Sequence, residues 1–104
     1  MAHSNRGPMT LEELRGRYRA EIVAIATKRG ARNVRVFGSI ARGDQSTHSE
    51  IDFLVDFKPG RSLLDLTGLW LDLEAALDCK VDVVSSRGLK PRLSAEVMRD
   101  AVPL

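Results

Sequence analysis

The first patterned part of the chain has the spacing of an amphipathic helix. Between residues 10 and 29, an apolar side chain recurs every three or four positions. The stripe consists of Leu11, Leu14, Tyr18, Ile22 and Ile25. Thr10 and Glu13 have the spacing of a capping box, in which each side chain binds a free amide at the helix start. Gly30 is suited to end the helix, because glycine readily adopts the left-handed conformation found just after a helix.

The pattern then changes to an alternation of apolar and polar residues, which is typical of β-strands. Three segments show it: residues 33–37, 50–57 and 80–85. In the second segment, one face carries Ile51, Phe53, Val55 and Phe57, and the other carries Glu50, Asp52, Leu54 and Asp56. In the third, Asp82 lies on the face opposite Val81 and Val83. We therefore expect acidic residues from two strands to share one face of a sheet.

Helices are expected around these strands. A short helix is predicted over residues 40–44, and a polar loop over residues 45–49, where His48 is better explained as solvated than as a metal ligand. Ser62 has the position of a helix cap, and Pro91 marks the approximate start of a last helix. The stripe after Ser62 consists of Leu63, Leu66, Trp70, Leu73 and Leu77. This order predicts an α/β (α+β) domain in which a small mixed sheet of about three strands packs against helices.

Size and composition favour a single domain. The chain has 104 residues, 43% of them hydrophobic, which is enough to form a core without disulfides. Residues 1–9 show no pattern, so we predict a flexible N-terminal extension and one domain over residues 10–104. The single cysteine, Cys79, excludes an internal disulfide and fits a reducing compartment. No stretch has the length of a membrane span, and we expect a cytoplasmic protein without membrane contact.

The charge is only mildly basic. The net charge is +2 and the isoelectric point about 9.0, with Lys and Arg scattered among nearly as many acids. No helix-turn-helix spacing or aromatic platform accompanies this charge, so we expect no direct nucleic-acid partner. The cations Arg87, Lys90 and Arg92 are best explained as a solvated face, with contact to a partner or RNA as the alternative.

One set of residues points to phosphate chemistry. Gly38-Ser39 lies where a predicted strand turns into a helix, so the backbone and the Ser39 hydroxyl can approach a bound anion. After ten intervening residues come Glu50 and Asp52, and Asp82 follows on the next predicted strand. Carboxylates that converge from two strands suit Mg²⁺, which can orient a triphosphate and activate an attacking hydroxyl. Each feature alone is an ordinary turn or strand edge, but together they predict phosphoryl or nucleotidyl transfer.

The ordered set resembles the signature of the DNA polymerase β-like nucleotidyltransferase superfamily. The run GSIARGDQSTHSEIDFLVDF from Gly38 to Phe57, the segment VDVV from Val81 and the ending DAVPL look like the minimal nucleotidyltransferases (MNT) of bacteria and archaea. The resemblance covers the chain from about residue 10 to residue 104. Many members of that family are antitoxins whose partner is a ribonuclease toxin with a HEPN domain.

The resemblance implies a fold, two cofactors and a reaction. The fold is that of the polymerase β-like nucleotidyltransferases, and the cofactors are ATP and Mg²⁺. The implied reaction transfers AMP from ATP to a tyrosine of the HEPN toxin and silences it, so a hetero-oligomer is the expected assembly.

The resemblance also implies roles for individual residues. The carboxylates implied to bind Mg²⁺ and carry catalysis are Glu50, Asp52 and Asp82. Asp82 is further implied to take the proton of the attacking hydroxyl. The residues implied to bind the triphosphate are Gly38, Ser39 and, as a further candidate, Arg42. Asp56 lies further along the acidic face and is treated as peripheral.

The sequence departs from the family at one of these positions. Glu50 stands where the family usually has an aspartate. Its longer side chain moves the carboxylate by more than about an ångström, enough to cost on the order of a hundredfold in rate. Two hypotheses follow: a competent transferase, or a protein of the same fold that neutralises the toxin by binding alone. A nucleic-acid-binding regulator ranks last.

Overall fold

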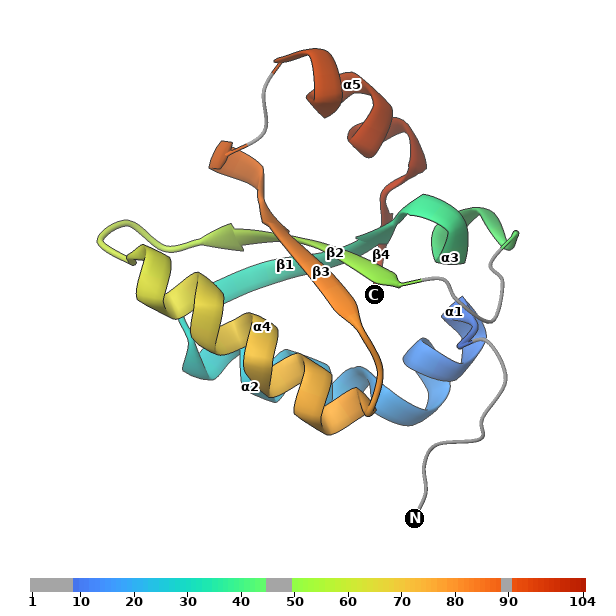
Figure 1. Ribbon diagram of the computed structural model, residues 1–104, viewed down its shortest axis with the longest axis horizontal. Helices are drawn as coiled ribbons and strands as arrows, with labels where there is room; N and C mark the ends of the chain where they lie inside the picture. Colours follow the sequence, from blue (N-terminus) through green and yellow to red (C-terminus); the bar gives the residue numbers. More distant parts are fainter. Residues whose placement is uncertain (1–8, 45–49, 89–90) are drawn as a thin grey trace.

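The computed structural model describes residues 9–44, 50–88 and 91–104 (Figure 1). The elements in chain order are α1 (Leu11–Glu13), the π-helical turn η1 (Leu14–Tyr18), α2 (Arg19–Lys28), β1 (Ala31–Phe37), α3 (Gly38–Arg42), β2 (Ile51–Phe57), α4 (Leu63–Leu77), β3 (Val81–Ser85), the 3₁₀ turn η2 (Ser86–Gly88), α5 (Pro91–Asp100) and β4 (Val102–Pro103). The predictions for residues 1–8, for the loop with His48 and for Lys90 fall outside the described residues. Met9, the first described residue, is buried in the core.

A four-stranded mixed sheet forms the centre of the fold. The strand order is β3-β2-β1-β4, with β1 antiparallel to both β2 and β4 and with β2 parallel to β3. The connection between the two parallel strands contains α4. The predicted class is therefore confirmed, but the sheet has one strand more than expected. That strand, β4, is two residues long, too short for an alternating pattern to reveal it.

The N-terminal helical region begins and ends as the sequence predicts. The Glu13 amide donates to Thr10 Oγ1 (3.0 Å), and the Thr10 amide donates to Glu13 Oε1 (3.3 Å), so the capping box forms. α1, η1 and α2 then follow one another without a break. Gly30 has a φ of +79°, which confirms it as the residue that ends the helix.

The two faces of the sheet have different coverings. α2 and α4 cover one face, and α5 lies over the other (Figure 1). On the α2/α4 side, Ile51, Phe53 and Val55 are fully buried in the core, as the alternation predicts. Asp52 and Leu54 alternate with these residues and therefore lie on the α5 side. Leu54 is fully buried there too, so the acidic face is partly apolar.

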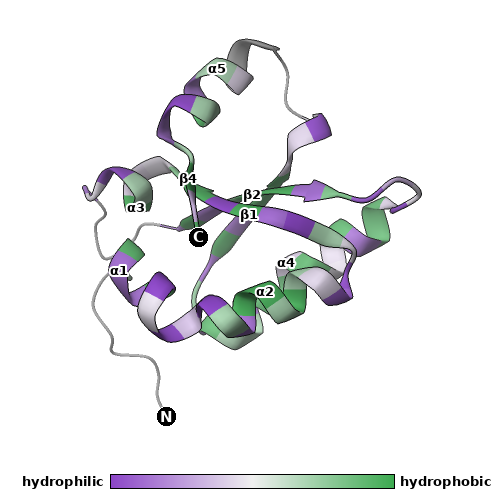
Figure 2. Ribbon diagram, turned by 180° about the vertical axis from the view of Figure 1, so that it is seen from behind, coloured by the Kyte–Doolittle hydropathy of each residue, from purple (hydrophilic) through white to green (hydrophobic). Residues whose placement is uncertain are grey.

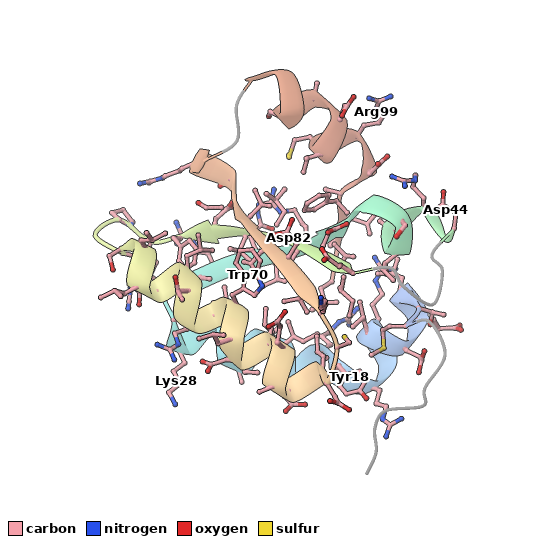
Figure 3. The ribbon with its side chains drawn as sticks, in the orientation of Figure 1. Tyr18, Lys28, Asp44, Trp70, Asp82 and Arg99 are labelled. Carbon is pink, nitrogen blue, oxygen red and sulfur yellow. The ribbon has the colours of Figure 1, made fainter. Side chains whose placement is uncertain are left out.

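The helix α4 buries most of the predicted stripe, with Leu66 and Trp70 packed against the core, but it adds Leu69 and leaves out Leu63. Leu69, Leu73 and Leu77 are fully buried, and Trp70 packs against the core between the helix and the sheet (Figure 3). Leu63 is instead 73% exposed, because it occupies the first position of the helix, next to the turn that leaves β2. Within the described ranges, no helix combines the length and the apolar character that a membrane crossing needs.

The segment after α5 ties that helix to the rest of the molecule. β4 pairs with β1, and Leu104 is buried in the core. Arg19 of α2 donates from Nε to the Leu104 carbonyl (2.8 Å), and Arg15 of η1 donates to the Pro103 carbonyl (2.5 Å). α5 is thereby held over the acidic face of the sheet, next to α3.

Candidate active site

The turn from β1 into α3 brings backbone unusually close to a carboxylate. Phe37 is extended, and Gly38, the first residue of α3, has a φ of +75°, a conformation that favours glycine. A Cβ atom at Gly38 would overlap the Asp52 carboxylate. Both the backbone conformation and the space therefore require glycine here. Ser39 follows in the first turn of α3, so the Gly-Ser pair lies directly beside the acidic residues.

The sheet register places two of the predicted carboxylates side by side. Asp52 of β2 and Asp82 of β3 are direct partners across the parallel strand pair, and Phe37 of β1 is the partner of Asp52 on its other side. Both aspartates are half-buried, and Figure 3 labels Asp82 on β3. Because residues at the same register position of a pleated sheet point to the same face, the two carboxylates share the α5 face.

Negative charge is concentrated around Asp52. Burial is the largest cause that raises its pKa to about 6, and the nearby charges of Asp82 and Glu50 raise it further, while the Arg42 guanidinium acts in the opposite direction. Such crowding disfavours the ionised carboxylate in the isolated protein. A bound cation would relieve it, because an opposite charge favours the ionised form.

Glu50 stands apart from the two aspartates. It precedes the first residue of β2 and is exposed, although its charge reaches Asp52. Within the part of the chain that the structure describes, no three acidic, His or Cys side chains come close enough to enclose a metal ion. The donor set still fits Mg²⁺, because adjacent aspartates supply the hard oxygen ligands that this ion takes while it keeps several waters. The structure thus brings together Asp52 and Asp82, and leaves Glu50 at the edge.

Arg42 lies in the last turn of α3, next to α5. Its guanidinium pairs with Asp100 of α5 (2.8 Å) and with Asp44 (3.2 Å), and these hydrogen bonds raise the pKa of Arg42. A pocket of about 190 Å³ between α3 and α5 adjoins this pair. Its lining consists of Phe37, Gly38, Arg42, Glu96, Val97 and Asp100. A cation therefore faces the same space as the Gly38 turn, as a phosphate contact would require.

The α5 side of this pocket was not anticipated from the sequence. Asp100 and Glu96 lie in the last helix, far along the chain from the Gly-Ser turn, and no spacing connects them with it. The acidic DAVPL ending is the only sequence signal that includes Asp100. The contact between Arg42 and Asp100 depends on β4, which pairs with β1 and so holds the end of α5 near α3.

Asp56 has a different environment, although it shares a strand and a face with Asp52. Burial acts to raise its pKa, but hydrogen bonds from Ser86, Asn33 and Arg35 and the charge of Arg35 lower the pKa overall. Its carboxylate accepts hydrogen bonds from Arg35 (2.6 Å) and from Asn33 (2.9 Å). Asp56 is thus engaged within the fold, which agrees with its treatment as peripheral.

A mixed sheet whose Gly-Ser turn faces carboxylates on two neighbouring strands defines a protein of the nucleotidyltransferase class. Residues 20–104 match the family described as Polymerase beta, Nucleotidyltransferase, and the chain belongs to this family. The predicted family is therefore confirmed.

Two relatives have closely similar sequences. The protein adenylyltransferase MntA of Thermococcus cleftensis is 37% identical over 94 residues, which cover 90% of this chain and 95% of that protein. A Methanocaldococcus jannaschii protein that carries the name of a protein adenylyltransferase is 40% identical over 82 residues, which cover 79% of this chain and 88% of that protein. Both alignments span most of the two proteins compared, so the similarity is not confined to the motif.

Solved structures share the fold. A protein that carries the name of a minimal nucleotidyltransferase has a TM-score of 0.80 and 50% identity, covering 92% of this chain and 97% of that chain. A toxin–antitoxin complex with AMP-PNP has a TM-score of 0.72 at 24% identity, covering 83% and 71%. A complex of an MNT antitoxin with a tri-AMPylated HEPN toxin from Shewanella oneidensis has a TM-score of 0.63 at 21% identity, covering 81% and 66%. At these lower identities the likeness supports the fold alone.

Proposed function

We propose that this chain is a Mg²⁺-dependent adenylyltransferase that transfers AMP from ATP to a tyrosine of a HEPN ribonuclease toxin and so neutralises it. The observation that carries the proposal is the pairing of Asp52 with Asp82 across β2 and β3, directly against the Gly38 turn. The names of the relatives, both given as protein adenylyltransferases, support the reaction class. The nucleotide and the partner are proposed by analogy with complexes of the same fold that contain AMP-PNP and a HEPN toxin.

The residues divide the chemistry among them. The acceptor hydroxyl oxygen forms a bond to the α-phosphorus of ATP, and the bond from that phosphorus to the bridging oxygen breaks, so pyrophosphate leaves with the electron pair. Asp82 takes the proton from the hydroxyl. The backbone of Gly38 and the Ser39 hydroxyl hold the β- and γ-phosphates, helped by Arg42.

A divalent cation would be held by Asp52 and Asp82, and the exposed Glu50 side chain, which precedes β2, would have to turn toward them to be a third oxygen donor. When bound, Mg²⁺ neutralises phosphate charge and lowers the barrier to attack on phosphorus. Without it, the carboxylates that raise the pKa of Asp52 also repel an incoming triphosphate. We therefore expect metal and nucleotide to bind together.

The acceptor is proposed to be a protein. The pocket beside Arg42 has a volume of only about 190 Å³, and the two aspartates are half-buried, so the chain alone does not enclose a large acceptor. A tyrosine presented by a partner's surface can approach such a site, and the partner's own surface would exclude water from it. A hetero-oligomer follows from this proposal, and the cytoplasm is proposed as its compartment.

A second candidate function is supported by Glu50. Its carboxylate is exposed and precedes the strand that carries Asp52, and it is a longer side chain than the family usually has at this position. If this geometry prevents turnover, the same fold would neutralise the toxin by occupying it. The two candidates differ in a single measurable property, which is covalent transfer.

The test is incubation of the protein with ATP labelled at the α-phosphate, Mg²⁺ and the HEPN protein encoded next to it. The adenylyltransferase predicts label on a tyrosine of the HEPN protein, no label after chelation of the metal, and no label with Asp52→Ala. A stable complex without label, together with no ATP binding by calorimetry, would favour the binding-only function. Full transfer by Asp52→Ala would contradict the assignment of Asp52 to the site, and the absence of both label and complex would contradict both functions.

A further inference from the structure

A second surface lies at the opposite end of β2 and β3 from the acidic pair. Here the turn after β2 leads into α4, and the first two residues of that helix are largely exposed: Leu63 by 73% and Leu64 by 80%. Figure 2 shows hydrophobic residues in the first turn of α4, beside the turn that leaves β2. Two adjacent leucines held in water on a rigid helix are unfavourable for an isolated protein, and such patches mark contact surfaces.

Cations surround these leucines. A pocket of about 270 Å³ lies between the start of α4, the end of β2 and the η2 turn, and three basic side chains line it: Lys58, Arg61 and Arg87. The rest of its lining is Phe57, Ser62, Leu63, Leu66 and Ser85. We call the surface made by Lys58, Arg61, Leu63, Leu64 and Arg87 the basic leucine patch.

The acids near this patch are already engaged. Asp65 accepts a hydrogen bond from the Ser62 amide (3.1 Å) as part of the α4 capping box, and it also pairs with Arg61 (3.4 Å). Among the described residues, Lys58 and Arg87 have no ion-pair partner. The N-terminus of α4 adds a partial positive charge. The patch is therefore apolar at its centre and positive at its rim.

We propose that the basic leucine patch docks an acidic, leucine-bearing segment of the acceptor protein, a proposal that rests on the proposed function. Charge complementarity selects the acidic segment, because Lys58 and Arg87 gain partners on binding. The exposed leucines select its apolar side chains, since an interface combines a desolvated apolar centre with a polar rim. Single-stranded RNA fits less well, because Phe57 is the only aromatic side chain among the pocket residues and is itself partly buried.

The position of the patch explains how docking and chemistry can occur together. Phe57 and Ser85 lie at the C-terminal ends of the two parallel strands, whereas Asp52 and Asp82 lie near their N-terminal ends. Phe57 is five positions along the strand from Asp52, which corresponds to roughly 17 Å. An acceptor held at the patch leaves the carboxylates free and raises the local concentration of its hydroxyl near them.

The proposal is tested first with a peptide probe. A fluorescein-labelled peptide in which two leucines are flanked by glutamates is titrated with the full chain, and binding is followed by anisotropy. Lys58→Glu/Arg87→Glu and Leu63→Ser/Leu64→Ser should each weaken binding by about tenfold or more. Arg99→Glu is the matched control, because Arg99 is an exposed cation on α5, away from the patch (Figure 3), and should bind as the unaltered chain does.

The outcomes separate this proposal from the proposed function. Lys58→Glu/Arg87→Glu should raise the KM for the HEPN acceptor about tenfold and leave ATP binding by calorimetry unchanged. Asp82→Asn should lose transfer but keep peptide binding. If the unaltered chain transfers no AMP, the peptide titration still tests the patch. Equal peptide affinity for the patch variants and Arg99→Glu would overturn the proposal, as would binding of a single-stranded RNA in place of the peptide.

Discussion

Asp52 and Asp56 lie on the same strand and the same face of the sheet, yet their surroundings shift their pKa values in opposite directions. Around Asp52, burial and the charges of Asp82 and Glu50 raise the pKa to about 6. Around Asp56, burial acts in the same direction, but Ser86, Asn33 and Arg35 outweigh it and lower the pKa. Two repeats of the strand alternation separate Asp52, whose charged form the fold does not stabilise, from Asp56, whose charged form it does.

The difference teaches which acid is structural and which is functional. A carboxylate that receives hydrogen bonds and an ion pair within the fold needs no ligand. A carboxylate crowded by like charges costs free energy in the folded state, and a group that retains such a cost is a candidate for binding or catalysis. Gly38, which leaves room for the Asp52 oxygens, points to the same conclusion from geometry alone.

The largest expected effect separates the acidic pair from Asp56. Asp82→Asn removes the proton acceptor and should lower AMP transfer by on the order of a thousandfold, and Asp52→Asn should lower it at least as far. Asp56→Asn is the matched control, because it makes the same change on the same strand face. Transfer rates measured under saturating ATP should stay close to normal for Asp56→Asn. A comparable loss of AMP transfer in all three variants would show that the different environments of Asp52 and Asp56 do not distinguish a functional acid from a structural one.

The next effect concerns Glu50. If its extra methylene is the only defect of the site, Glu50→Asp should raise the transfer rate by on the order of a hundredfold, because catalytic geometry is sensitive to shifts of about an ångström. Glu50→Gln keeps the length but removes the charge, and should lower transfer. Single-turnover rates with labelled ATP would measure both. An unchanged rate in both variants would exclude Glu50 from the site and leave Asp52 and Asp82 as the whole carboxylate set.

A smaller effect is expected on stability. Asp56→Ala leaves Arg35, whose side chain is 13% exposed, without its ion pair, and should lower the free energy of unfolding by about 1–2 kcal/mol. Asp44→Ala is the control, because its pair with Arg42 joins two exposed side chains and is expected to contribute less than about 0.5 kcal/mol. Urea denaturation would measure both. Equal losses would mean that burial of Arg35 does not strengthen its pair.

Much of this contrast could be predicted from the sequence. The alternation in β2 identifies which residues share a face, since the period of two is a property of any strand. It therefore assigns Asp52 and Asp56 to one face correctly. The same alternation in β3, with Val81 and Val83 on either side of Asp82, places Asp82 on that face too. The Gly-Ser pair at a strand end indicates a close approach of the backbone, and Gly38 has the required positive φ.

The environment of each acid could not be predicted in the same way. The partners of Asp56 come from β1 and from η2, and Asp100 reaches Arg42 from a position 58 residues further along the chain. Such contacts depend on strand order and on the anchoring of α5 by β4, and local spacing carries no information about either. The exposure of Leu63 has the same origin, because a helical stripe does not reveal where the sheet beneath it ends.

The smallest expected effect is a pH-dependent difference in stability between Asp52→Asn and the unaltered chain. The folded-state pKa of Asp52 is about 6, above its ordinary value of 3.8. Protonated Asp52 therefore contributes stability that is fully present below about pH 3.8. This contribution is lost as the pH rises through 6. Asparagine does not titrate. The variant should therefore gain stability relative to the unaltered chain between about pH 4 and pH 7, by on the order of 1 kcal/mol, since the carboxylate is only half-buried.

Asp56→Asn should behave in the opposite way in the same measurement. The pKa of Asp56 is lowered in the folded state, so its carboxylate stabilises the fold above its unfolded pKa, and this contribution is lost as the pH falls through the folded value. Its variant should therefore lose stability relative to the unaltered chain as the pH rises from acid to neutral. Urea midpoints at four pH values would compare the two variants directly. A gap for Asp52→Asn that does not change with pH would contradict the crowding of the acidic pair, and with it the reason to regard Asp52 as a cation ligand.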